Sequence, residues 1–238
     1  MTTTIARTTP ADSVIDEAAD IVAAYFSRLL PVLESHAQQL SAQLDGLASE
    51  GLTAARVDEL VKPHAGAIMD DAGEPVYGAG FIATVDLLDD APSHLAWWQG
   101  EDRRKLVFPP QSVKQGIDYR ELEWFRVPLM SGRSHIAGPY VDYLCSDEYT
   151  MTAATPVRAG GRFAGVAGLD VVVEAIERRL TPPLRALGAE LVLVNGVDRV
   201  LVSTDPRYGA GDVLRPAQAV VMTRRRCDQV DLDILALA

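Results

Sequence analysis

Two aspartates, Asp142 and Asp170, are the first candidates for a binding site. Asp170 lies in an otherwise apolar run, where a buried carboxylate is costly unless it has a hydrogen-bond or charge partner. In the strand expected around Tyr140, alternation places Tyr140 and Asp142 on one face. If this face lines a pocket with Asp170, Trp124 and Phe125, two carboxylates lie beside several aromatic rings. Such a group suits an ammonium ion, because carboxylates accept its N–H bonds and aromatic faces add about 0.5–2 kcal/mol of cation–π attraction.

Both aspartates have a second interpretation. Asp170 stands shortly before Glu174, where a helix is expected to begin, and an N-cap aspartate accepts a hydrogen bond from the first turn of its helix. Asp142 and Tyr140 would be an ordinary solvated pair if their face turned outward. The sequence leaves a helix cap and a ligand contact equally open for Asp170.

Three segments in this region resemble the central part of Cache sensor domains. They are Gly138–Asp142, Thr152–Val157 and Phe163–Val171, and the Trp124-Phe125 pair upstream resembles a further element of the family. The resemblance covers roughly residues 60–205. It implies an α+β, PAS-like fold in which a long N-terminal helix packs on a central antiparallel sheet, and a domain that senses a small molecule without catalysis.

The resemblance also implies roles for single residues. In the amino-acid-binding Cache domains of bacterial chemoreceptors, the positions that match Tyr140, Asp142 and Asp170 hold the amino group of the ligand. The arginine and tyrosine that hold the ligand's carboxylate fall on Leu122 and Ile117 here. A ligand with an amine and no α-carboxylate is therefore as well supported as an amino acid. Nearby residues that could replace the missing clamp, although their spacing assigns them no role, are Tyr119, Arg120 and Arg126.

The aromatic element at Trp97 and Trp98 supplies one more candidate. The two residues are adjacent, so at most one of them is expected to face a pocket. Core packing is the alternative for both, since it accounts for most buried tryptophans. We keep Trp98 as a candidate ligand contact.

The elements that must position these residues follow from hydrophobic periodicity. We expect a helix from residue 10 to 30 that Pro31 kinks or ends, a helical continuation over 32–44, and a short helix over 53–62 that stops before Pro63. A hairpin over 67–77, irregular aromatic loops over 80–135, a meander over 139–144, 149–157 and 163–171, a helix over 174–180 and a hairpin over 191–203 complete the expected order. The chain divides in this prediction into a helical segment (1–60), a ligand-binding domain (61–215) and a tail (216–238).

Composition narrows the function classes. The formal net charge is −11, from 22 basic and 33 acidic residues, and a surface of this sign repels nucleic acid. The Arg224–Arg226 run is expected to be a solvated segment. We find no signal-peptide core and no run of about 18 apolar residues, so we expect a cytoplasmic protein outside the membrane. Two distant cysteines, Cys145 and Cys227, indicate neither a disulfide framework nor a zinc site.

Enzyme motifs are missing from the sequence. The four histidines are scattered, no nucleotide-binding or nucleophile-elbow pattern is present, and the acidic cluster of Asp86, Asp89 and Asp90 lacks the spacing of a calcium loop. We therefore expect no catalytic residue, metal or cofactor. The alternative is a small hydrolase that uses Asp142 and Asp170 as a carboxylate pair. Expected partners are a small-molecule ligand, a second copy through the first helix, and a separate signalling protein such as a transcription regulator.

Overall fold

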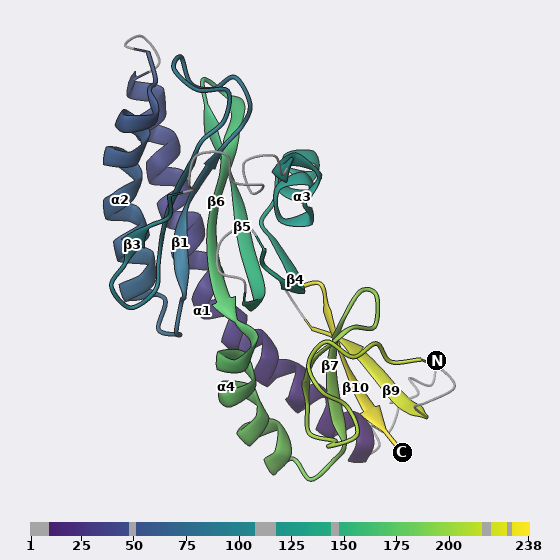
Figure 1. Ribbon diagram of the computed structural model, residues 1–238. Coiled ribbons are helices and arrows are strands. Elements are labelled where there is room, and N and C mark those ends of the chain that lie inside the picture. Colours follow the sequence, from purple (N-terminus) through teal and green to yellow (C-terminus); the bar gives the residue numbers. More distant parts are fainter. Residues whose placement is uncertain (1–9, 48–50, 108–117, 144–147, 216–219, 228–229) are drawn as a thin grey trace, which may run out of the picture. The chain divides into compact units, whose positions relative to one another are not determined.

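The computed structural model describes residues 10–47, 51–107, 118–143, 148–215, 220–227 and 230–238. The described part of the chain divides into two compact units, residues 27–173 and residues 1–26 with 174–238. The helices are α1 (Pro10–Leu47), α2 (Ala54–Asp71), α3 (Glu123–Ser131), preceded by a 3₁₀ turn at Tyr119–Glu121, and α4 (Val173–Ala186). The strands are β1 (Gly78–Ala83), β2 (Leu95–Gln99), β3 (Arg104–Lys105), β4 (His135–Val141), β5 (Tyr149–Ala159), β6 (Arg162–Val172), β7 (Leu191–Asn195), β8 (Val200–Ser203), β9 (Val221–Arg226) and β10 (Leu232–Leu237) (Figure 1).

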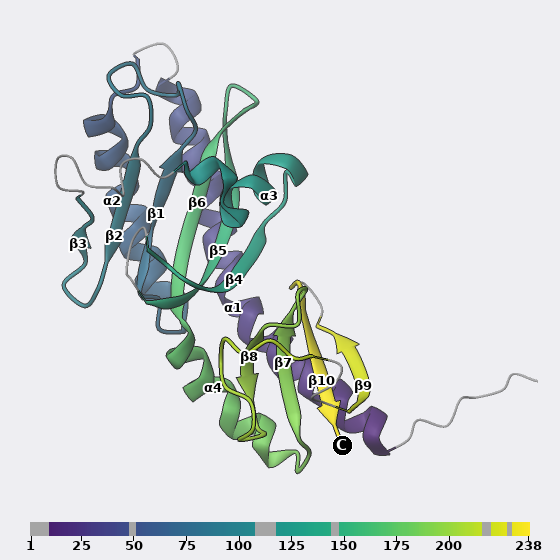
Figure 2. The ribbon, with the colours of Figure 1, turned by 45° about the vertical axis from the view of Figure 1, so that its right-hand side comes forward.

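The unit of residues 27–173 is built on an antiparallel sheet in the order β3-β2-β1-β6-β5-β4. In Figure 2, α1 and α2 lie behind this sheet and α3 lies in front of it. The face toward α3 carries a cluster of buried apolar side chains in which Trp97, Trp124 and Phe125 pack with Ile82 and Val166. Helix α3 thus covers one face of the sheet with aromatic side chains.

Helices α1 and α2 are longer than the sequence indicates. The helix expected from residue 53 does begin here, and the hydroxyl of Thr53 caps α2 by accepting a hydrogen bond from Arg56 N at 3.3 Å. However, α2 continues through Pro63 to Asp71, so the expected stop at residue 62 and the hairpin over 67–77 are both wrong. The buried side chains of α2 keep a helical spacing on both sides of the proline: they are Val57, Val61, His64, Ala65 and Ile68. Pro31 likewise lies inside α1 and does not end it.

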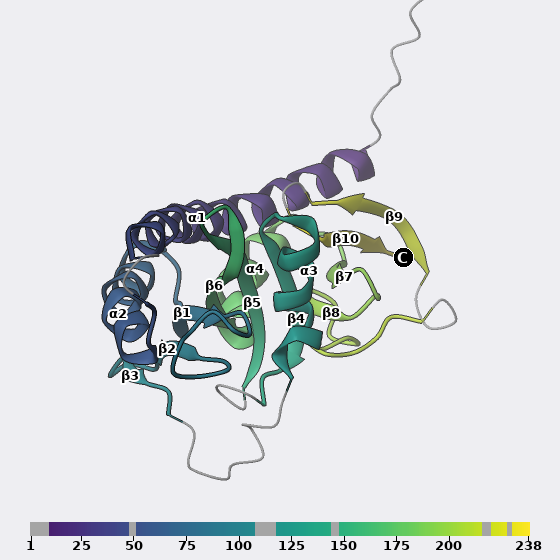
Figure 3. The ribbon, with the colours of Figure 1, turned by 90° about the horizontal axis from the view of Figure 1, so that it is seen from above.

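Polar contacts join α1 to α2 and to the residues that follow α2, and the two helices lie side by side in Figures 1 and 3. Arg28 pairs with the buried carboxylate of Glu74 directly after α2, with Nε and Oε1 2.8 Å apart. His36 and His64 approach each other through their Nδ1 atoms at 2.9 Å. These contacts hold the helical layer that supports the back of the sheet.

The meander expected from the sequence is confirmed by β4, β5 and β6. Its longest pairing runs from Thr150 opposite Val172 to Ala159 opposite Arg162. The stretch 80–135, expected to be irregular, instead supplies most of β1, all of β2 and β3, and helix α3. Glycines within β1 obscured its strand pattern, because glycine weakens the strand signal that alternating side chains give.

The second unit contains a four-stranded antiparallel sheet in the order β8-β7-β10-β9. The hairpin of β7 and β8 is confirmed. Residues 216–238, expected as a tail, are wrongly assigned, because β9 and β10 belong to this sheet and β10 pairs with the central strand β7. The three consecutive arginines of β9 pair with acidic residues of the same unit: Asp16, Asp198, Asp231 and Asp233.

The observed architecture is α+β, with a long N-terminal helix and antiparallel sheets, as the sequence predicts. Among the helices that the structure describes, none has the length and apolar character needed to cross a bilayer.

Candidate functional site

A partly enclosed pocket lies on the face of the larger sheet that α3 covers. The empty space within it, together with the open solvent at its mouth, is about 300 Å³. Five strands (β1, β2, β4, β5 and β6), α3 and the residue that follows β4 contribute to its wall. The lining residues are Ile82, Leu95, Trp97, Trp124, Tyr140, Asp142, Thr152, Gly168 and Asp170.

A β-bulge in β4 brings Tyr140 onto the pocket face. Ala137 pairs with Thr152 and Tyr140 pairs with Thr150, so β4 has one extra residue between the two pairs. Without this residue, strand alternation would turn Tyr140 away from the face that Ala137 occupies. Gly138 forms the bulge with a φ of +117°, and a Cβ there would lie 2.8 Å from the carbonyl oxygen of Thr150. Glycine is therefore required at this position.

Trp97 is one of the residues that line the pocket. Strand pairing places Gly80 between Trp97 of β2 and Gly168 of β6. A Cβ on Gly168 would meet Cζ3 of Trp97 at 3.3 Å, and a Cβ on Gly78 would meet its Nε1 at 2.7 Å. The indole therefore occupies space that two glycines on neighbouring strands leave open.

A short hydrogen-bond chain connects the aromatic wall with a carboxylate. Thr152 and Asp170 are register partners, and the Thr152 hydroxyl donates to Asp170 Oδ1 at 2.6 Å. The Tyr140 hydroxyl contacts the same Thr152 oxygen. Asp170 lies within β6 and lines the pocket, so its side chain is not the cap of α4. The structure thus excludes the cap interpretation, and a ligand contact by Asp170 stays a prediction.

Two buried carboxylates share the pocket. Asp170 is 2% exposed and Asp142 is 5% exposed. Burial raises the pKa of the Asp170 carboxyl well above its ordinary value, and the nearby Asp142 carboxylate raises it further, whereas the hydrogen bond from Thr152 lowers it. None of the nine described lining residues is Lys, Arg or His. The described wall therefore offers negative charge and aromatic surface without a cationic side chain.

No family model matches the sequence. Solved structures with similar folds include the ligand-binding domain of the Pseudomonas aeruginosa amino-acid chemoreceptor PctC in complex with GABA, which is 16% identical, with a TM-score of 0.58 over 95% of this chain and 96% of that chain. The ligand-binding domain of the Pseudomonas fluorescens chemoreceptor CtaA, in complex with L-isoleucine, is 15% identical, with a TM-score of 0.59 over 96% and 90% of the two chains. The extracellular domain of mmHK1S-Z2, a chain named as a histidine kinase, is 13% identical, with a TM-score of 0.64 over 96% and 97%. This chain has the Cache fold.

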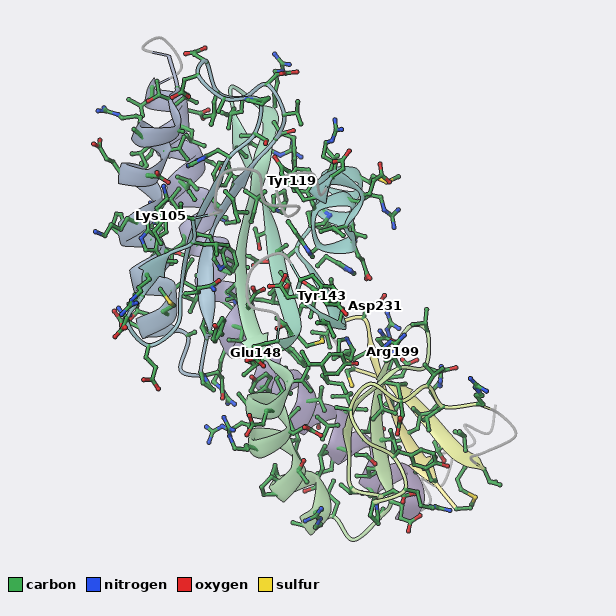
Figure 4. All side chains as sticks on the ribbon, viewed as in Figure 1. Lys105, Tyr119, Tyr143, Glu148, Arg199 and Asp231 are labelled. Atoms are coloured by element: carbon green, nitrogen blue, oxygen red, sulfur yellow. The ribbon has the colours of Figure 1, made fainter. Side chains whose placement is uncertain are left out.

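In this Cache fold, four of the residues singled out from the sequence line one pocket: Trp124, Tyr140, Asp142 and Asp170. Phe125 and Tyr119 lie beside it in the aromatic cluster. Phe125 is fully buried against Phe163 and Tyr119, with ring centroids 5.5 and 5.3 Å apart. Tyr119, labelled next to α3 in Figure 4, stacks on Trp124 and donates its hydroxyl hydrogen to the Ala83 carbonyl at 2.8 Å. Neither residue is among those that line the pocket.

Trp97, and not Trp98, lines the Cache pocket. Trp98 is buried, but alternation along β2 turns it toward the opposite face of the sheet. Thr152 and Gly168 were not among the candidate site residues, and they belong to the pocket through their register with Asp170 and Ala154. Strand pairing between distant segments could not be derived from local pattern.

None of the described residues considered for a carboxylate clamp is among those that line the pocket. Leu122 precedes α3 and packs against the apolar cluster, and Ile117 lies outside the described residues. Arg120 pairs with Asp118, with Nε and Oδ1 2.7 Å apart. Arg126 is exposed. Among the described His, Cys, Asp and Glu residues, no group of three or more is arranged to hold a metal ion.

Proposed function

We propose that this chain is a non-catalytic sensor domain that binds a small molecule with a cationic amino group, such as an amine, a quaternary ammonium compound or an amino acid. The observation that carries the proposal is the meeting of the buried residues Asp142 and Asp170 in one partly enclosed pocket that Trp97, Trp124 and Tyr140 also line.

The electrostatics favour a cationic ligand. Ionising two almost fully buried carboxylates side by side is costly, and either protonation of one of them, as the raised pKa of Asp170 indicates, or a bound cation offsets this cost. An ammonium group between Asp142 and Asp170 would supply the positive charge and donate hydrogen bonds to both. The faces of Trp97 and Trp124 would add cation–π attraction, which is strongest where water is excluded.

The structural comparisons support the same ligand class. PctC was solved with GABA, and CtaA was solved with L-isoleucine and with L-serine. These ligands share an amino group, which is the part of a ligand that the acidic pocket of this chain would hold. Their carboxylates have no basic partner among the described lining residues here. We therefore place amines and quaternary ammonium compounds beside amino acids as candidate ligands.

As a sensor, the chain would pass its ligand-bound state to a separate partner, such as a signalling protein or transcription regulator, or to a second copy through α1. These partners and the cytoplasmic location expected from the sequence stay predictions. The compared receptor domains are named as chemoreceptor or extracellular domains.

Calorimetric titration with a panel of amines, quaternary ammonium compounds and amino acids tests the proposal. We expect at least one member to bind, and we expect Asp142→Asn and Asp170→Asn each to weaken its binding about tenfold or more, because each removes a charge-assisted contact. The exposed Asp20 provides a matched control, and Asp20→Asn should bind as wild type does.

Two results would contradict the proposal. One is a panel without any binder, and the other is undiminished binding by both pocket variants. The same samples are assayed for products, since turnover that Asp142→Asn or Asp170→Asn abolishes would support the carboxylate-pair hydrolase instead.

A further inference from the structure

One polar atom of the pocket residues has no partner. Trp97 is 2% exposed, and its Nε1 forms no hydrogen bond with any of the residues that the structure describes. An indole N–H can only donate a hydrogen bond, so this atom needs an acceptor from elsewhere. Buried donors are nearly always paired in folded proteins, and an unpaired one calls for an explanation.

The position of this atom relates it to the acidic side of the pocket. Nε1 lies 2.7 Å from the point where a Cβ of Gly78 would stand. Gly78 is the register partner of Asp170 across β1 and β6, and paired residues direct their Cβ positions to the same face about 4.5–5.5 Å apart. The unpaired N–H therefore lies about the distance between two neighbouring strands from Asp170, on the face of the sheet that forms the pocket.

The absence of a side chain at Gly78 creates this arrangement. Any larger residue there would displace the indole nitrogen, because 2.7 Å is shorter than ordinary contact distances of a Cβ atom. The far edge of the same ring lies over Gly168, which also lines the pocket. The indole of Trp97 therefore reaches across β1, with its donor nitrogen over Gly78, the register partner of Asp170.

We propose that Trp97 Nε1 selects ligands that carry a neutral hydrogen-bond acceptor oxygen close to their ammonium group, as amino alcohols and their ethers do. This inference rests on the proposed function, because it assumes an ammonium at Asp142 and Asp170. The ligand oxygen would then accept the hydrogen bond that the free protein leaves unmade. A neutral oxygen fits better than a carboxylate, since two carboxylates are already present and no cationic side chain is among the described lining residues.

A pair of isosteric ligands isolates this contact. 2-Methoxyethylamine and n-butylamine have the same length and the same ammonium group, but only the first has an oxygen. An ether oxygen cannot donate to Asp142 or Asp170, so a preference for the ether reports an acceptor function. We expect wild type to bind 2-methoxyethylamine about tenfold more tightly than n-butylamine, because satisfying a buried donor is worth about this factor.

Two variants test whether Trp97 causes the preference for 2-methoxyethylamine over n-butylamine. Trp97→Phe keeps an aromatic ring and removes the N–H, and it should bind both amines with nearly equal affinity. Trp98→Phe makes the same change on the opposite face of the sheet and should keep the tenfold preference. The indole N–H resonance of Trp97, followed by ¹⁵N NMR in the unaltered chain, should move downfield with 2-methoxyethylamine and not with n-butylamine, which tests the contact even if Trp97→Phe does not fold.

The outcomes separate the two proposals. If neither amine binds to wild type, and the wider panel also contains no binder, the proposed function fails. If both amines bind with equal affinity, or if the preference persists in Trp97→Phe, only the role of Trp97 is overturned.

Discussion

Thr152 and Asp170 face each other across β5 and β6, and the threonine hydroxyl donates a 2.6 Å hydrogen bond to the aspartate Oδ1. Because this hydroxyl has a single hydrogen, its oxygen serves as the acceptor for the hydroxyl of Tyr140. Thr152 therefore links the aromatic wall of the pocket to a buried carboxylate. The link favours the ionised form of Asp170, against the burial that disfavours it.

Thr152→Val should weaken the binding of an ammonium ligand at neutral pH about three- to tenfold. Valine keeps the shape of threonine but cannot donate to Asp170, so the pKa of Asp170 rises further and less of the carboxylate is ionised. Thr155→Val is the matched control, because Thr155 is a buried threonine of the same strand whose hydroxyl contacts Ser134 instead. Equal losses of affinity in the two variants would show that the hydroxyl at residue 152 has no particular role.

The affinity for a quaternary ammonium ligand should rise with pH. Such a ligand keeps its charge at every pH, so a change in affinity reports the protein. The pKa of Asp170 is raised well above its ordinary 3.8 by burial and by Asp142, and below that raised pKa the carboxyl is neutral and attracts the ligand less. Titration calorimetry with tetramethylammonium from pH 4.5 to 8 should show an increase of up to about tenfold per pH unit that flattens at high pH. Asp170→Asn should remove the dependence, and a flat profile in wild type would contradict it.

Much of the fold follows from the sequence because its signals are local. The alternation and turns of the meander, and the helical periodicity of α1, were sufficient to predict these elements. The continuation of α2 past Pro63 was missed because proline usually ends a helix, whereas here Ala65 and Ile68 keep the helix packed on β1 and β2. Strand β9 was missed because its residues are mostly exposed and its arginines hide any alternation.

The site was predictable only where residue type indicated chemistry. Asp142 and Asp170 stood out as charges in apolar surroundings, and Tyr140 followed from alternation with Asp142. The sequence could not show which of Trp97 and Trp98 faces the pocket, since a shift of one residue in strand register reverses the two faces of a strand. Thr152 enters the pocket only through the pairing of β5 with β6, which no local pattern specifies.

Asp170→Asn should stabilise the empty protein at pH 7 while it weakens ligand binding. A carboxyl whose pKa is raised in the folded state holds its proton more tightly than the unfolded chain does, so its contribution opposes folding as pH rises above 3.8. Asparagine avoids this penalty and can still accept the hydrogen bond from Thr152, and we expect a gain on the order of 1–2 kcal/mol. Thermal melts from pH 4 to 8 should show the gain growing with pH. Asp20→Asn, an exposed control, should melt as wild type does, and an Asp170→Asn variant that melts lower at pH 7 would contradict the prediction.

The contact between His36 and His64 should make the larger unit less stable in mild acid. Their Nδ1 atoms are 2.9 Å apart, so at least one of them must be unprotonated to accept the hydrogen of the other, while His64 Nε2 lies 3.1 Å from Gln43 Oε1. Burial lowers the pKa of both histidines below 6.5, the charge of His36 lowers that of His64 further, and the charge of Asp71 partly offsets the effect on His36. A histidine whose pKa is lower in the folded state contributes stability that is present above pH 6.5 and is lost as pH falls below it.

Chemical denaturation at pH 7.5 and pH 5 measures this loss, which we expect to be on the order of 1 kcal/mol. His64→Gln should be less stable than wild type at pH 7.5, because the contact with His36 is changed, and should lose less on acidification. His135→Gln is the control, since His135 binds Glu123 in another part of the unit and its replacement leaves the α1–α2 contact intact. If His64→Gln and wild type lose equal stability between the two pH values, the histidine pair is not the cause of the loss of stability at low pH.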